Sequence, residues 1–512
     1  MTPITKYFPE RFAGDALDVV PLLHAGFQGT DGEDLIVYEG ESIGRGRLRG
    51  QVARLQQALV DQGLRQGDHV AVMLSNSAEH IALIYALIVS GLVWVPVNTK
   101  LRGAGLKYVL EHAAPRLLVA EPEFREVLDA ETVGGIATID LEQLAAQGGA
   151  GHELRRIEVD HAATLCIIYT SGTTGAPKGV IFTHRMMRIA TEAALIVAGI
   201  RAGDRVFLWE PLCHIGGAQM LMVPFLEKAP LHVVRRFSAT RFWRQWAAAR
   251  ATHLHYLGGV LDILMQLPEA GQPADAAIRV AWGAGVSASA WAAVRERLHC
   301  EIRECYGMTE CSSFATLNAS GKPGSIGRPL PWIRIELLDE NGRPVPTGEI
   351  GEIVLSSDLP GVFLPGYLNN PEATGKALRE GRLHTGDSAR QDADGDYVFV
   401  GRRTDSMRVR GENVSAWEVE RVFADHPAIQ ASAAVGVASD VGEQEILLFV
   451  QGKPGARLDW VELVAWATPK LAAFQLPRFY RQVEGFDLTP SERIQKHRLA
   501  RSTEHAWDRK AG

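Results

Sequence analysis

The stretch YTSGTTGAPKGV, from Tyr169 to Val180, combines three glycines, four aliphatic hydroxyl side chains and one lysine. Glycine reaches backbone angles at which successive N–H groups converge on one point, so such a loop can surround a phosphate chain. The loop lies between ATLCIIYT and GVIFTH, two apolar segments that are predicted as buried strands. A flexible linker, the alternative for a mixture of Gly, Ser and Thr, does not usually interrupt two core strands. The stretch therefore favours a phosphate-binding loop.

The composition indicates a soluble globular protein, because 46% of the 512 residues are hydrophobic and 22% are charged. A net charge of −7 gives no basic surface for nucleic acid, so no nucleic-acid partner is expected. The apolar run HIALIYALIVSGLVWVPV is interrupted by Gly91 and Pro96, which predicts a buried helix and a strand instead of a membrane span. The first residues show no secretory signal, and a cytoplasmic location is expected. The five cysteines form no CxxC pair and are expected to be core thiols.

The order of segments predicts an α/β fold. Up to about residue 400, helix-like segments such as GRLRGQVARLQQALVDQGL alternate with strand-like segments such as DHVAVML, a pattern typical of parallel sheets covered by helices. Between residues 321 and 402, short strands separated by Gly and Pro predict an antiparallel β region. The remainder has a shorter α+β pattern. We therefore predict a large domain over residues 1–404 and a small one over residues 405–512.

Three further segments carry polar side chains. YGMTE, residues 306–310, offers a ring, a hydroxyl and a carboxylate for a base, a phosphate and a magnesium ion, although a turn after a strand is an alternative. HTGD, residues 384–387, places a carboxylate where it can accept hydrogen bonds from two sugar hydroxyls. GRRTD, residues 401–405, supplies guanidinium groups, with a surface arginine pair as the alternative. Each segment alone is a weak signal.

Taken together, TSGTTGAPKG, YGMTE, TGD, GRRTDSMRVRGENVS and TPSERIQKHRL resemble the adenylate-forming superfamily of acyl-CoA synthetases, luciferases and peptide-synthetase adenylation domains. The chain is most similar to the acyl- and aryl-CoA ligase branch, near carnitine- or crotonobetaine-type ligases. The resemblance implies a large adenylate-forming domain, with α/β sheets and a small β region, and a small mobile α+β C-terminal domain.

The resemblance also implies a reaction in two steps. A carboxylate attacks the α-phosphate of ATP to give acyl-AMP and pyrophosphate, and the thiol of coenzyme A then displaces AMP. Such a site positions its substrates and stabilises developing charge, without a protein nucleophile. The expected cofactors are ATP, Mg2+ and coenzyme A, and the expected partners are a small carboxylic acid and CoA or another nucleophile. A homodimer is left open.

Nucleotide contacts follow from the resemblance as well. Lys178 is expected to be the cation of the phosphate loop, and Tyr306 to stack on adenine. Thr309 is expected to touch the α-phosphate, Glu310 to hold magnesium, and Asp387 to bind the ribose hydroxyls. The other expected nucleotide contacts are Thr170, Ser171, Gly172, Thr173, Thr174, Gly175, Gly283, Ala284, Gly285, Gly307, Met308 and Arg402.

The acyl pocket and the hinge are assigned in the same way. His214 matches a family position at the entrance of the acyl pocket, and Asp405 matches the hinge about which the small domain rotates between the two steps. In the second conformation, Gly411, Glu412 and Asn413 would line the approach of the thiol. Glycines in the pocket leave room for a substrate larger than acetate. The other expected pocket residues are Gly216, Gly217, Tyr256, Gly258, Gly259 and Gly283.

The chain departs from the family at its C-terminal motif. Where the family has glycine and the catalytic lysine, this sequence has Glu492 and Arg493. We expect Arg493 still to bridge the acyl carboxylate and the α-phosphate, with a poorer fit because a guanidinium is longer and planar. This departure keeps two alternatives open. The first is a ligase that transfers its acyl-adenylate to an amine, and the second is a weakened homologue that only binds nucleotide or acyl ligand.

Overall fold

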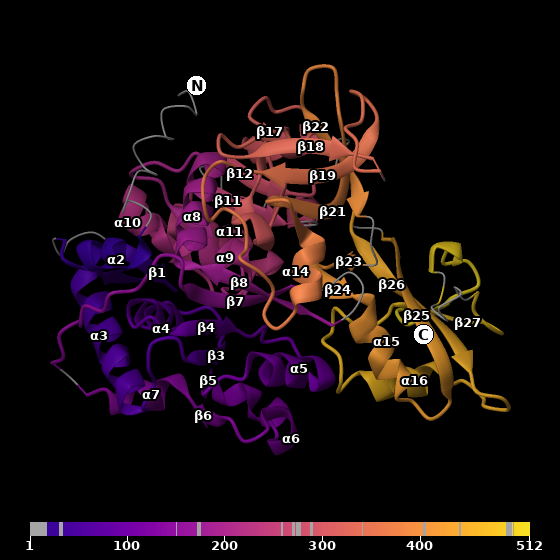
Figure 1. The fold of residues 1–512 in the computed structure, drawn as a ribbon, viewed down its shortest axis with the longest axis horizontal. Coiled ribbons are helices and arrows are strands. Elements are labelled where there is room, and N and C mark those ends of the chain that lie inside the picture. Colours follow the sequence, from indigo (N-terminus) through magenta and orange to yellow (C-terminus); the bar gives the residue numbers. More distant parts are fainter. Residues whose placement is uncertain are drawn as a thin grey trace.

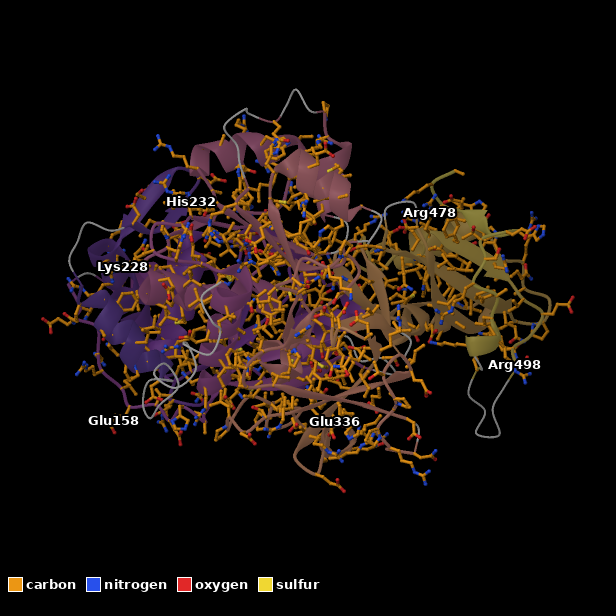
Figure 2. The ribbon with its side chains drawn as sticks, turned by 90° about the horizontal axis from the view of Figure 1, so that it is seen from above. Glu158, Lys228, His232, Glu336, Arg478 and Arg498 are labelled. Carbon is orange, nitrogen blue, oxygen red and sulfur yellow. The ribbon has the colours of Figure 1, made fainter. Side chains whose placement is uncertain are left out.

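The computed structural model describes most of the chain. The described residues are 18–29, 34–149, 151–170, 176–257, 260–268, 272, 278–286, 290–339, 341–402, 406–439, 442–487, 494 and 496–511. Figure 1 shows a large domain built around two mainly parallel sheets, with a smaller domain beside it. In Figure 2, Arg478 and Arg498 of the small domain lie on the opposite side of the molecule from Lys228 and His232.

The phosphate-loop stretch belongs to a six-stranded sheet. Its strands follow the order β6 (Ala137–Ile139), β5 (Leu117–Ala120), β3 (His69–Met73), β4 (Val93–Pro96), β7 (Thr164–Thr170) and β8 (Lys178–Thr183). All neighbouring strands are parallel except β7 and β8, which form an antiparallel pair. The outer helices of this half are α2 (Val19–Phe27), α3 (Arg45–Asp61), α5 (Gly103–Ala113) and α7 (Leu141–Gln147).

The second sheet has seven strands. Their order is β13 (Glu301–Glu304), β12 (Val280–Ala284), β11 (His253–Leu257), β9 (Val206–Leu208), β10 (Leu231–Val233), β1 (Asp34–Tyr38) and β2 (Glu41–Gly44). Only β2 runs antiparallel to its neighbour. Because parallel strands carry their ligands at the carboxyl edge, residues that follow these strands are candidates for one common site. The helices of this half include α11 (Phe242–Ala249), α12 (Val260–Gln266) and α13 (Trp291–Leu298).

Two apolar helices are buried in the large domain. Helix α8 (His184–Ala198) contacts strands of both sheets, and nearly all of its residues are buried. Helix α4 (Ala78–Val89) forms the first part of the apolar run and β4 the last part, as the sequence predicts. The Ser77 side chain caps the first turn of α4 by accepting a hydrogen bond from the His80 N–H. In the part of the chain that the structure describes, no helix is both long and apolar enough to cross a membrane.

The antiparallel β region predicted between residues 321 and 402 is present. It contains β18 (Arg334–Leu338), β19 (Ile350–Ser356), β20 (Leu378–Arg379), β21 (Arg382–Gln391) and β22 (Tyr397–Arg402). Helix α14 (Pro371–Ala377) precedes β20. In Figure 1 this region lies above the two parallel sheets, with α14 and β21 directed toward the small domain. It therefore brings segments from late in the large domain close to the domain junction.

The small domain has the predicted α+β order. Its elements are β23 (Ser406–Val409), β24 (Glu412–Ser415), α15 (Ala416–Ala424), β25 (Ile429–Ala438), β26 (Gln444–Gly452), α16 (Trp460–Ala467), β27 (Phe479–Gln482) and β28 (Trp507–Asp508). Its apolar core, from Met407 to Tyr480, is separate from the cores of the large domain. The expected boundary between residues 404 and 405 falls in a stretch outside the described residues and stays a prediction.

Candidate active site

The predicted phosphate loop joins two paired strands. Lys178, the first residue of β8, pairs with Thr170, the last residue of β7. The Lys178 Nζ lies 5.0 Å from the centroid of the Tyr367 ring. Burial lowers the pKa of Lys178, whereas the carboxylate of Glu310 raises it. The loop residues expected to bind phosphate lie outside the described residues; these are Ser171, Gly172, Thr173, Thr174 and Gly175.

Tyr367 connects Lys178 to Glu310, the expected magnesium ligand. Its hydroxyl donates a hydrogen bond to Glu310 Oε1 at 2.8 Å while its ring faces the lysine. The N–H of Leu364 donates to the Glu310 carbonyl at 2.9 Å, and the N–H of Leu368 donates to the carbonyl of the residue after Lys178 at 2.8 Å. The segment 364–368 therefore fixes these two side chains relative to each other. Sequence reasoning missed Tyr367, since no spacing distinguishes a single tyrosine from a core residue.

Tyr306 and Asp387, expected at the adenine and the ribose, are in direct contact. The Tyr306 hydroxyl donates to Asp387 Oδ2 at 2.7 Å, and both side chains are buried. The rings of Tyr306 and Phe399 are stacked, with centroids 5.9 Å apart. Asp387 on β21 pairs with Arg402 on β22. The strand register and the tyrosine hydroxyl thus bring three of the expected nucleotide contacts together.

The turn that follows Tyr306 holds the other expected contacts. Gly307 and Met308 form the short strand β14 (Gly307–Met308), and Thr309 begins the 3-10 helix η7 (Thr309–Cys311). A Cβ atom at Gly307 would lie 1.8 Å from the carbonyl oxygen of Ser313, so only glycine fits this close approach. Thr309 and Glu310 are both buried in the turn. The sequence YGMTE is therefore a tight turn that carries two polar side chains into the interior.

A buried glutamate supports the wall expected from AWGAGVS. Gly283 has a φ of +152°, and a Cβ atom there would lie 1.9 Å from the carbonyl oxygen of Tyr256. The N–H of Gly285 donates to Glu304 Oε1 at 2.6 Å, and the Tyr256 hydroxyl donates to the same carboxylate. Burial raises the pKa of Glu304 to about 7. Ala284 ends β12 between these glycines. Glu304 was not anticipated, although its place at the end of a strand beside YGMTE was a signal.

The residues expected in the acyl pocket do not all lie on one face of the structure. Gly216 and Gly217 lie in the short helix α9 (Ile215–Ala218), which begins directly after His214. A Cβ atom at Gly216 would lie 3.2 Å from His255 Cε1, so His255 is the residue against this glycine. Tyr256 lies on the other face of β11 and is completely buried, because successive side chains of a strand alternate. The expected pocket residues Gly258 and Gly259 lie outside the described residues.

Glu412 joins the small domain to the entrance of the expected pocket. Its Oε2 lies 2.9 Å from His214 Nε2, and its Oε1 accepts a hydrogen bond from Lys100 Nζ at 2.9 Å. Burial alone would raise the pKa of Glu412, but His214 and Lys100 lower it to about 2. Lys100 Nζ also lies 5.3 Å from the ring centroid of Phe474 in the small domain. Two residues that the sequence assigned separately, His214 and Glu412, are thus in contact.

A cavity of about 1440 Å³ opens at this junction. Both domains line it, with Cys213 and His214 on one side and Gly411 and Glu412 on the other. Burial raises the pKa of the Cys213 thiol, so this cysteine is not an activated nucleophile. The cavity exceeds the volume of an ordinary small-molecule pocket, roughly 300–1,000 Å³, and has room for an extended substrate.

Several expected site residues cannot be placed. Asp405 and Arg493 lie outside the described residues, as do the side chains of Arg402 and Asn413. Lys496, the next lysine after Arg493, forms a 2.7 Å ion pair with Glu420 inside the small domain. In this arrangement Lys496 is held away from the site and does not replace the missing lysine.

The fold and site define an adenylate-forming enzyme, and comparison with known proteins places the chain in a family. The family described as AMP-binding enzyme matches residues 26–368, and the AMP-binding enzyme C-terminal domain matches residues 418–493. The chain therefore belongs to the AMP-binding enzyme family. It is 32% identical over 456 residues to the crotonobetaine/carnitine–CoA ligase of Salmonella typhimurium, which covers 84% of this chain and 88% of the relative.

Two solved structures are similar over almost the whole chain. The first is a double mutant of o-succinylbenzoate CoA synthetase from Bacillus subtilis bound with a product analogue, with a TM-score of 0.84, 25% identity and coverage of 93% and 97% of the two chains. The second is the amide bond synthetase McbA from Marinactinospora thermotolerans, with a TM-score of 0.83, 27% identity and coverage of 93% and 98%. The predicted fold class is confirmed.

A further solved structure has the same fold. It is the Bacillus subtilis o-succinylbenzoate CoA synthetase in complex with its acyl-adenylate intermediate, with a TM-score of 0.69, 24% identity and coverage of 93% and 97% of the two chains.

Proposed function

We propose that this protein is an ATP-dependent carboxylic acid–CoA ligase that forms an acyl-adenylate and releases AMP and pyrophosphate. The family and the CoA ligase relatives support this reaction class. The observation that carries the proposal is the contact of Glu412 with His214 at the mouth of the interdomain cavity. This contact joins the small domain to the acyl-pocket entrance and leaves a cavity of about 1440 Å³ for an acceptor, as thiol transfer requires.

In the first step, the large domain would hold MgATP. Lys178 would contact the phosphates, Thr309 the α-phosphate and Asp387 the ribose, with Tyr306 against the base. Glu310 fits magnesium, because it is a buried carboxylate 2.8 Å from the Tyr367 hydroxyl, and magnesium is usually held by one or two carboxylates together with phosphate oxygens. When bound, magnesium neutralises charge that develops on the phosphates. Arg493 would bridge the acyl carboxylate and the α-phosphate in this step.

In the second step, the interdomain cavity would admit the acceptor. Glu412 would hold His214 beside the acyl carbonyl and fix the small domain through Lys100. The resemblance to the family implies that the small domain rotates near Asp405 between the two steps, so the two steps would use two domain arrangements. The hinge and the cytoplasmic location stay predictions from the sequence, and a homodimer stays open.

A second candidate function is amide formation. The similarity to an amide bond synthetase favours it. In this case the acyl-adenylate forms as before and an amine enters the cavity instead of a thiol. The first step is common to both candidates, so the acceptor alone separates them.

One experiment separates the candidates. The purified protein is incubated with ATP, Mg2+ and a panel of carboxylic acids, with CoA, with amines or with neither, and the products are identified by mass. A CoA thioester together with AMP supports the main proposal. An amide formed faster than any thioester supports the second candidate. Absence of pyrophosphate with every acid contradicts both.

A further inference from the structure

His214 and Glu412 form a histidine–carboxylate pair at the place where the two domains meet. His214 lies between β9 and α9 of the large domain, whereas Glu412 is the first residue of β24 in the small domain. Glu412 Oε2 lies 2.9 Å from His214 Nε2. The carboxylate is buried, but the side chain of the histidine is 37% exposed. A buried carboxylate thus holds an imidazole that remains accessible.

The carboxylate decides which nitrogen of the ring carries the proton. Burial would raise the pKa of Glu412, but His214 and Lys100 lower it to about 2, so this carboxylate is ionised at neutral pH. An ionised carboxylate only accepts hydrogen bonds, so the His214 nitrogen that contacts it, Nε2, must be the donor. In the neutral ring, Nδ1 then has the free lone pair.

The Nδ1 atom of His214 is open to the interdomain cavity. Within the described part of the chain, the polar contacts of the ring all involve Nε2, and His214 lines the cavity. Asn98 Nδ2 lies 3.5 Å from Nε2, too far to compete with the carboxylate. The titratable groups beside the ring are Glu412, Lys100 and Cys213, and burial raises the pKa of the Cys213 thiol, which stays protonated. A lone pair in this position can accept a proton from a molecule in the cavity.

The proposed second step needs such a base. The thiolate, not the thiol, is the nucleophile, and only a few per cent of a thiol of cysteine-like acidity is ionised at pH 7. A carboxylate that fixes the tautomer of a histidine, and stabilises the imidazolium that forms, is the arrangement that activates hydroxyl and thiol nucleophiles in enzymes. In this protein the nucleophile would belong to the acceptor.

We propose that His214 is the general base of acyl transfer and that Glu412 is its positioning residue, so that the base is completed only when the domains are in contact. The inference rests on the proposed function for the acyl-AMP and the thiol. The thiol proton passes to His214 Nδ1, and a sulfur electron pair forms the C–S bond at the acyl carbon. The C–O bond to AMP breaks, and its electron pair leaves with AMP. The imidazolium then loses the proton to water.

Two other readings make different predictions. In the first, a phosphate oxygen of the acyl-AMP accepts the proton, and His214 is not needed for proton transfer. In the second, Glu412 only holds the ring aside from the cavity mouth, so that removing the ring would leave acyl transfer as fast as before or faster. The dependence of transfer on pH and on added bases separates both readings from the proposal.

The first experiment follows acyl transfer from pre-made acyl-AMP to CoA by rapid quench. The acyl-AMP is that of the best acid of the panel, or benzoyl-AMP if no acid is used. Between about pH 7 and 9, the rate of the unmodified protein should change less than about threefold. His214→Ala should be at least about 100-fold slower at pH 7, the scale of general-base catalysis, and should gain roughly tenfold per pH unit because it depends on thiolate already present. A rate for His214→Ala that runs parallel to that of the unmodified protein would overturn the proposal.

Added bases test the proton transfer itself. Imidazole should restore transfer by His214→Ala at least about tenfold, whereas pyrazole, a ring of the same size that is hardly basic, should not. Equal effects of the two compounds would overturn the proposal. His214→Gln keeps a donor for Glu412 and lacks a basic nitrogen, so it should show the same pH dependence as His214→Ala and replaces it if that variant does not fold.

Three further variants separate positioning from domain docking. Glu412→Gln should slow transfer about 10- to 100-fold and make it rise with pH more steeply than in the unmodified protein. Lys100→Met removes the other partner of Glu412 and should lower transfer by a similar factor at every pH. His161→Ala removes a histidine that pairs with Asp18 away from the cavity lining, and it should change neither rate nor slope. If Glu412→Gln lowers the rate without changing the slope, Glu412 serves docking alone and its positioning role is wrong.

The same measurements distinguish this inference from the proposed function. If CoA is acylated but the variants keep the pH dependence of the unmodified protein, the base fails and the proposed function stands. If only amines are acylated, and the slope and the imidazole effect appear with an amine, the CoA ligase proposal fails and the base stands. If acyl-AMP gives neither thioester nor amide, both fail.

Discussion

The nucleotide side and the acceptor side of the site are built in different ways. On the nucleotide side, Tyr367 bonds Glu310 and Tyr306 bonds Asp387, both within the large domain. On the acceptor side, Glu412 of the small domain bonds Lys100, which is 312 residues earlier in the chain. The first set of contacts survives any movement of the small domain, whereas the second exists only when the domains meet in this arrangement. The contacts of the expected nucleotide residues are therefore preformed within the large domain, whereas those on the proposed acceptor side depend on the domain arrangement.

The largest effect is expected from breaking the nucleotide side. Glu310→Gln removes the charge that would hold magnesium, so pyrophosphate release should fall at least about 100-fold, the scale of losing one preorganised electrostatic contact. Acyl transfer from pre-made acyl-AMP should change much less. The control is Glu336→Gln, a carboxylate that pairs with Arg382 in the β region and is marked in Figure 2. Adenylation above half of the original rate in Glu310→Gln would show that the acidic residue of YGMTE is structural.

The next effect comes from breaking the acceptor side. Glu412→Gln removes the charge that contacts His214 and Lys100, so acyl transfer from acyl-AMP should fall by about 10- to 100-fold, as expected for charge-assisted hydrogen bonds. Pyrophosphate release should stay near its original rate. Both half-reactions are followed separately by rapid quench.

A matched variant tests whether the domain contact is responsible. Glu445 is as buried as Glu412 and also meets two cations, Arg478 and Lys510, but both belong to the small domain. Glu445→Gln should lower the melting temperature without a selective loss of acyl transfer. Equal losses of transfer in the two variants would mean that the Glu412 contact stabilises the small domain and does not serve the second step.

A smaller effect is expected when Tyr367, on the nucleotide side, loses its hydroxyl group. Tyr367→Phe keeps the ring beside Lys178 and removes only the hydrogen bond to Glu310, worth about 1 kcal/mol. The Mg2+ concentration for half-maximal adenylation should rise about three- to tenfold, and calorimetry should show weaker binding of MgATP. Tyr397→Phe, which removes a hydroxyl bonded to the carbonyl of Ile335, is the control. An unchanged Mg2+ requirement in Tyr367→Phe would leave Tyr367 as a packing residue.

The smallest effect concerns the pH dependence of stability, in which Glu304 of the large domain and Glu412 of the small domain are expected to differ. The pKa of Glu304 is raised to about 7, so its protonated form stabilises the fold below pH 4.5, and this stabilisation is lost as the pH rises toward 7. The melting temperature should therefore fall by a few degrees between pH 5 and 7.5. Glu304→Gln should flatten this fall. Glu412, with a pKa of about 2, stays ionised over the same range, so domain docking measured by scattering should not change. Parallel melting curves of the two proteins against pH would contradict the assignment to Glu304.

Local signals explain what could be predicted. YGMTE and TGD stood out because each combines glycine with hydroxyl and carboxylate side chains within a few residues, and the structure places Tyr306 against Asp387. The family resemblance and the fold class were confirmed by the comparisons. Tyr367, Glu210 and His255 were missed, because a buried tyrosine, glutamate or histidine has no spacing that distinguishes it from an ordinary core or surface residue.

The sequence by itself determined the alternation of strands and helices, the glycine turns and the order of the polar segments. These features depend on backbone preferences and hydrophobic periodicity, which act over a few residues. Only the tertiary structure decided that Glu412 meets His214, and that Asp204, before β9, pairs with Arg279 while Glu210, after β9, pairs with His255. The physical reason is that pairing between distant side chains depends on how sheets and domains pack, so two carboxylates at the two ends of one strand receive different neighbours.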